Sequence, residues 1–120
     1  MGRVAELGSL GGMGVTPQIL NAAMRAYVHT FPNRKGLVEH IAALGLAEHS
    51  DDITAQLDAV LKTAEDYLYS FPGGVPWSES FERDYHALLR RQHTWLDSES
   101  LGRVHGFSGW LCWHEGLNAR

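Results

Sequence analysis

Cysteine is almost absent from this sequence, since Cys112 is the single one among 120 residues. One thiol cannot form an internal disulfide, so a disulfide-stabilised scaffold is excluded. Because Cys112 lies in a tryptophan-rich stretch, we expect it to be a small buried apolar group rather than a reactive thiol. The scarcity of cysteine fits a reducing compartment, and we expect the protein to be cytoplasmic.

The sequence also lacks a long apolar run and a cluster of basic residues. No stretch approaches the roughly 18 to 20 apolar residues that a membrane-spanning helix needs, so we expect no membrane partner. Ten lysines and arginines against fourteen acidic residues give a formal net charge of −4. Nucleic-acid binding normally needs a basic face that neutralises phosphates. Since the basic residues are scattered, we expect no nucleic-acid partner.

Motifs that hold phosphates, metals or catalytic nucleophiles are missing as well. The sequence contains no P-loop, no G-x-G-x-x-G dinucleotide motif and no C-x-x-C pair. His114 and Glu115 begin like the zinc-protease motif H-E-x-x-H, but Asn118 stands where the second histidine is needed. The stretch 106–110 lacks the final glycine of a nucleophile elbow. We therefore predict no cofactor and favour a role without catalysis.

What the sequence does contain is helical periodicity in about five segments. Apolar residues recur at intervals of three and four, and no segment alternates apolar and polar residues as a half-buried strand does. The predicted helices cover residues 17–31, 34–44, 51–71, 79–96 and 99–116. Capping residues mark their starts: Thr16, Asn33, Asp51, Ser78 or Ser80, and Asp97 or Ser98. Short connections predict an all-α class, a single compact bundle with antiparallel neighbours.

The first predicted helix has a clear division into two sides. Phe31 falls on its apolar arc, just before Pro32 stops the helix. Asn21 falls on the opposite side, where polar residues normally face solvent.

Glycine is concentrated at the start of the chain, where residues 1–15 hold five of the thirteen glycines. Glycine costs backbone entropy in any ordered element. We expect residues 1–15 to be a flexible leader, which lacks the apolar segment of a signal peptide. Alternatively it is an extension upstream of a start at Met13. The bundle domain is then residues 16–120.

The last predicted helix is apolar on nearly all sides, with Phe107, Trp110 and Trp113 beside its aliphatic face. Three glycines lie near one another on a flank: Gly102, Gly106 and Gly109. Together they cost about 2–3 kcal/mol relative to alanine, which suggests that another backbone approaches closely. We expect this helix at the centre of the bundle, wrapped by the other four. In the alternatives, an aromatic side stays exposed for a partner, or the glycines break the helix near residues 106–109.

Histidine is frequent, with seven in 120 residues. Glu82, His86 and His93 share a stripe of the fourth predicted helix, as ligands of Zn²⁺ would. His86 and His93 are about 10 Å apart along the helix axis, however, which is too far for one tetrahedral ion. A solvated flank is the simpler interpretation, and we predict no metal. His105 and His114 border the apolar and aromatic sides of the last helix.

We predict a non-catalytic protein–protein interaction module, or one that self-associates. The surface expected to carry this role comprises five residues: Phe107, Trp110, Trp113, His105 and His114. The alternative is a bundle that binds a small ligand or metal, with or without catalysis, in a pocket lined by the tryptophans and histidines of the last two helices.

Overall fold

The computed structural model describes residues 15–120, and the order of elements along them is that of an all-α protein. The helices are α1 (Pro17–Tyr27), α2 (Arg34–Ala43), α3 (Ser50–Tyr69), α4 (Glu79–Gln92) and α5 (Ser98–Glu115), with a short 3₁₀ turn, η1 (Ala47–His49). The described residues contain no strand, only two isolated bridges, which confirms the predicted fold class. No helix in this part of the chain is long and apolar enough to cross a bilayer.

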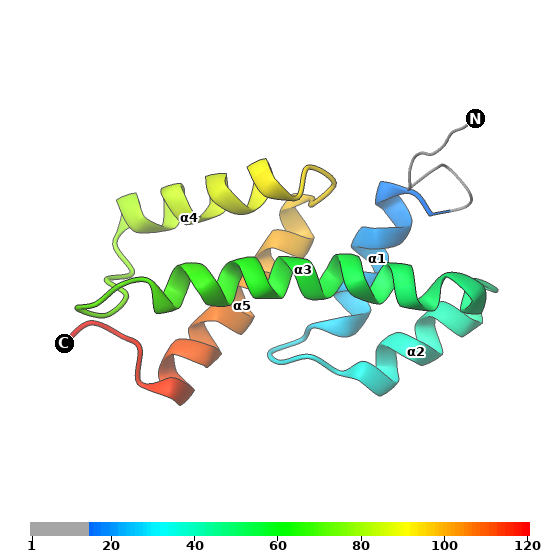
Figure 1. The fold of residues 1–120 in the computed structure, drawn as a ribbon, viewed down its shortest axis with the longest axis horizontal. Coiled ribbons are helices and arrows are strands. Elements are labelled where there is room, and N and C mark those ends of the chain that lie inside the picture. Colours follow the sequence, from blue (N-terminus) through cyan, green and yellow to red (C-terminus); the bar gives the residue numbers. More distant parts are fainter. Residues whose placement is uncertain (1–14) are drawn as a thin grey trace.

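The longest helix, α3, is the one against which α1, α4 and α5 pack, whereas α2 packs mainly on α1. In Figure 1 it runs along the length of the molecule, with α4 and α5 at one end and α1 and α2 at the other. It contacts α1, α4 and α5. Six residues of its apolar face are buried: Ile53, Leu57, Val60, Leu61, Ala64 and Leu68. One face of α3 therefore supplies the continuous part of the core.

The prediction that α5 is the central helix is wrong. It packs against α1 and α3 and buries one face, while Trp113 on the other side is 73% exposed. The helix is unbroken through residues 106–109. A Cβ added at Gly102, Gly106 or Gly109 would meet nothing within 4 Å, so no backbone within residues 15–120 approaches these glycines. Within the described part of the chain, the long, two-sided apolar pattern of α5 thus has only one side covered.

Helix α1 ends at Tyr27, four residues earlier than predicted. The residue before a proline avoids the helical conformation, so Pro32 bends the chain before Phe31 can join the helix. The turn is closed by the backbone N–H of Asn33, which donates to the carbonyl of Tyr27 at 2.7 Å, and by a bridge between Val28 and Pro32. Phe31 is consequently 56% exposed instead of buried.

Asn21 was expected on the solvent-facing side of α1. It is instead buried and links α1 to the turn before α5. Its Nδ2 donates to the carbonyl of Trp95 at 2.7 Å, and its Oδ1 accepts from the backbone N–H of Asp97 at 2.9 Å. Its own carbonyl accepts from the hydroxyl of Ser100. The turn begins four residues earlier than predicted, because α4 ends at Gln92 and not at residue 96.

The expected leader, residues 1–15, lies outside the described residues except for its last position. Val15 is buried and packs against the core.

The C-terminal residues are tied to the loop between α3 and α4. The N–H of Val75 donates to the carbonyl of Leu117 at 2.7 Å, and the N–H of Ala119 donates to the carbonyl of Val75 at 2.9 Å. Gly74 lies beside this pair with φ +94°, and a Cβ there would come within 2.7 Å of the backbone of Ala119. Only glycine fits that position, on both conformational and steric grounds.

We expect Gly74→Ala to lower the free energy of unfolding by about 1–3 kcal/mol, because the side chain forces an unfavourable φ and displaces the C-terminal residues. Denaturation in urea measures this change. The matched control is Gly73→Ala, where a Cβ meets nothing within 4 Å, and there we expect a change within about 0.5 kcal/mol. Equal effects of the two substitutions would contradict the close approach at Gly74.

Candidate functional site

The side of α5 that the fold leaves uncovered carries a group of aromatic rings. Trp113 is its most exposed member, and Phe31 reaches it from the loop after α1. The rings of Phe31 and Trp110 have centroids 5.6 Å apart, and Trp110 stacks on His114 with centroids 4.9 Å apart. Trp110 and Trp113 are neighbours at a spacing of three on the helix. We call these four residues, Phe31, Trp110, Trp113 and His114, the aromatic face.

The residues predicted for a partner surface fall into three settings. Trp110, Trp113 and His114 lie together on the aromatic face. Phe107 is buried and belongs to the core. His105 pairs with α4 instead. Among the tryptophans and histidines considered for a pocket, His105 lies beside His86 and Trp77, whereas His114 stacks on Trp110.

The residue that the sequence interpretation missed on the aromatic face is Phe31. The signal was Pro32, which restricts the residue before it to non-helical conformations.

Opposite the buried side of α5, four residues form one row along the helix: Gly102, Gly106, Gly109 and Trp113. Their spacings of four, three and four keep them within a narrow arc at about 100° per residue. We call this row the glycine–tryptophan row. It holds no charged residue, and nothing within the described chain occupies the space above its glycines. Along this row the three glycines leave the helix backbone without side chains, and the indole of Trp113 stands at its end.

A second constellation lies between α4 and α5, where His86 and His105 face each other. Nε2 of His86 is 3.0 Å from Nδ1 of His105, a hydrogen-bond distance. Trp77 packs edge-on against the ring of His105, with centroids 5.4 Å apart. Burial lowers the pKa of His86, and the neighbouring His105 lowers it further.

The stripe of Glu82, His86 and His93 does not converge. His93 lies beyond the end of α4, and its Nε2 is 2.9 Å from the hydroxyl of Thr63 on α3. Within residues 15–120, no group of three or more histidine, cysteine, aspartate or glutamate residues is placed to hold a metal ion. The early end of α4 separates the residues that a longer helix would have aligned.

We expect the protein to lose stability as the pH falls from 7.5 to 5, because burial lowers the pKa of His86 and of His93. Each histidine is neutral in both states above its unfolded pKa of about 6.5. Below that value the unfolded chain takes up protons first, so the free energy of unfolding decreases until the folded histidines also protonate. Urea denaturation across this pH range measures the slope.

The controls for this pH dependence are substitutions by glutamine. The pair His86→Gln and His93→Gln is expected to flatten the slope, whereas His114→Gln, at an exposed position, is expected to leave it unchanged. A stability that stays constant or rises on acidification would contradict the assignment.

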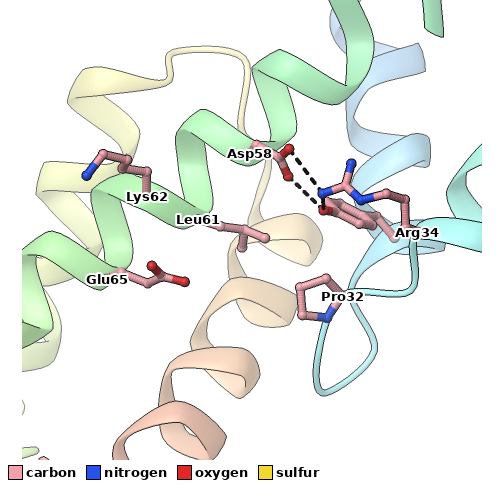
Figure 2. A pocket seen from close by; sticks show the side chains of 7 residues that line it. Pro32, Arg34, Asp58, Leu61, Lys62 and Glu65 are labelled. Carbon is pink, nitrogen blue, oxygen red and sulfur yellow. Dashed lines mark hydrogen bonds and ion pairs between the residues drawn. The ribbon is translucent and has the colours of Figure 1, made fainter. Parts of the chain in front are cut away.

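A polar depression of about 320 Å³ lies between α3 and the turn after α1 (Figure 2). The hydroxyl of Tyr27 donates to Asp58 at 2.7 Å and accepts from Arg34 at 2.8 Å. Arg34 also pairs with Asp58 at 3.3 Å. Burial, together with the hydrogen bond to Asp58, raises the pKa of Tyr27 to about 12. Because these three side chains satisfy one another's hydrogen bonds, we interpret them as a structural link between α1, α2 and α3.

Comparison with known proteins adds no relative. No family model matches the chain, and neither curated proteins nor solved structures give a match. The described residues form an α-helical bundle in which one helix face is aromatic and exposed.

Proposed function

We propose that this protein is a non-catalytic interaction module, and that its partner surface is the aromatic face together with the glycine–tryptophan row of α5. The observation that carries the proposal is Trp113, which is 73% exposed. Burying a side chain of this size on association stabilises a complex by roughly 2–3 kcal/mol. Tryptophan is enriched among the residues that dominate binding energy, and contiguous apolar patches on a monomer mark interaction sites.

The partner that best fits this surface is a second copy of the chain. The spacing of the row, four then three then four, reads the same in both directions. If two copies of α5 pack antiparallel about a twofold axis at the middle of the row, Trp113 of each copy lies over Gly102 of the other. Gly106 of one copy then lies opposite Gly109 of the other. A twofold interface requires this kind of self-complementary patch.

Charge and space both favour the pairing. The row has no charged residue, so no like charges meet across the twofold axis. The three glycines cost the isolated helix about 2–3 kcal/mol relative to alanine. Nothing in the described chain uses the space they leave, whereas a second helix would fill it.

The proposed contact runs along α5 and widens on one flank. An α5 of 18 residues is about 27 Å long, and Phe31, Trp110 and His114 widen the contact on one flank. Specific interfaces bury about 800 Å² on each partner. We propose that the dimer acts in the cytoplasm, where the single buried thiol of Cys112 stays reduced.

Size-exclusion chromatography of two matched variants tests the proposal. Trp113→Ser is expected to shift the protein from dimer to monomer. Val38→Ser removes another apolar side chain, 52% exposed but on α2, and is expected to elute with the unmodified chain. Equal elution of all three proteins as monomers, or as dimers, would contradict the role of Trp113.

A further inference from the structure

His86 and His105 bring two imidazole nitrogens to 3.0 Å from different helices. We propose that this pair is a binding site for a divalent metal ion that takes nitrogen ligands, such as Zn²⁺. The site does not depend on the partner surface of α5, because the pair lies between α4 and α5. It differs from the predicted stripe in that His105 takes the place of His93.

The separation of the two nitrogens suits a shared ion. Two nitrogen ligands at the usual Zn–N length of about 2.0–2.1 Å are about 2.9 Å apart at a right angle and about 3.3 Å apart at the tetrahedral angle. The observed 3.0 Å falls between these values. Both nitrogens can therefore reach one ion with α4 and α5 in place, provided that each ring rotates so that its lone pair turns from the other nitrogen toward the ion. Water would fill the remaining coordination positions.

Binding requires both facing nitrogens to be free of protons. In the hydrogen-bonded pair one of them carries the proton and the other accepts it. When the ion binds, the donor ring moves this proton to its other nitrogen, so a neutral pair changes tautomer without losing a proton. A protonated ring would have to release a proton, and affinity therefore falls at acidic pH.

The surroundings of the pair are two aromatic rings and one carboxylate on α4. Trp77 packs on His105, and the ring centroids of Tyr85 and His86 are 6.0 Å apart, so each imidazole has an aromatic ring beside it. Glu82 precedes His86 by one helical turn, and its negative charge acts on that ring. Arg90, one turn after His86 on α4, donates to Ser98 at 2.8 Å, and its positive charge lowers the pKa of His86.

Calorimetric titration of the full chain with ZnCl₂ at pH 7.5 tests the site. One saturable equivalent is expected, with an affinity at least about tenfold weaker after His86→Ala or His105→Ala, a difference of about 1.4 kcal/mol. His93→Ala and His114→Ala are the matched controls, and both should bind as the unmodified chain does. Absence of saturable binding, or unchanged binding by His105→Ala, would overturn the proposal.

Nuclear magnetic resonance of the unmodified protein gives a readout that does not depend on the folding of variants. Zn²⁺ is expected to shift the ¹⁵N signals of Nε2 of His86 and Nδ1 of His105. Shifts confined to His114, which pairs with Glu115 at 2.9 Å, or to His93 would overturn the site. The mass of the protein in solution does not affect this result, so the metal site and the dimer are tested independently of each other.

Discussion

Replacing Asn21 by alanine is expected to lower the free energy of unfolding by about 3 kcal/mol, measured by urea denaturation. Asn21 is 5% exposed and its amide joins α1 to the turn before α5. Removing the amide leaves the carbonyl of Trp95 and the N–H of Asp97 without their partner. Each polar group that is buried without a partner costs about 1–3 kcal/mol.

Two further substitutions separate hydrogen bonding from size and position. Asn21→Leu keeps the number and branching of the side-chain heavy atoms but neither donates nor accepts a hydrogen bond, so it is expected to destabilise the protein as well. Gln18→Ala removes an amide from an exposed position of the same helix, and a change within about 0.5 kcal/mol is expected. A loss below about 1 kcal/mol for Asn21→Ala would contradict the bridging role.

The second large effect is expected at Gly106, in the middle of the glycine–tryptophan row. Gly106→Arg places a long cation where the second helix would approach, and the dissociation constant of the dimer should rise at least about 100-fold, or about 2.7 kcal/mol. The free energy of unfolding of the single chain should rise by about 0.8 kcal/mol, because arginine is a better helix former than glycine and nothing lies within 4 Å of the new Cβ. Sedimentation velocity and thermal unfolding measure the two effects.

A control with the same added charge is Ala87→Arg, at an exposed position of α4. It should leave the dissociation constant unchanged, since α4 lies outside the proposed interface. If the dissociation constant rises equally in both variants, the added charge explains the effect and the position of Gly106 in the glycine–tryptophan row does not. If Gly106→Arg associates like the unmodified chain, the proposed packing is wrong.

Local signals in the sequence predicted the starts of four helices, whereas α3 begins at Ser50 without the capping hydrogen bond expected of Asp51. Thr16, Asn33, Ser78 and Asp97 cap helices as expected, each accepting a hydrogen bond from a backbone N–H three residues later. Capping and periodicity are properties of a few adjacent residues, so they can be recognised without knowing the rest of the fold.

Contacts between distant residues were not predictable in the same way. Asn21 is buried because it meets Trp95, 74 residues later in the chain. No periodicity within α1 reveals that contact. The pairing of His86 with His105 likewise depends on how α4 and α5 are placed against each other, although each histidine was noted on its own helix.

The partner surface could not be predicted from the sequence either. The sequence of α5 offers two apolar sides, and periodicity alone cannot select which one α1 and α3 cover. The fold covers the side with Phe107 and leaves Trp113 outside. The same selection explains why the glycines have open space above them and not a neighbouring backbone.

Sedimentation equilibrium of the unmodified full chain, over a range of micromolar concentrations at neutral pH, tests the central claim most directly. The proposed antiparallel pairing of α5 predicts a mass approaching 26.6 kDa, twice the 13.3 kDa of one chain. A mass that stays at 13.3 kDa at every concentration would contradict it.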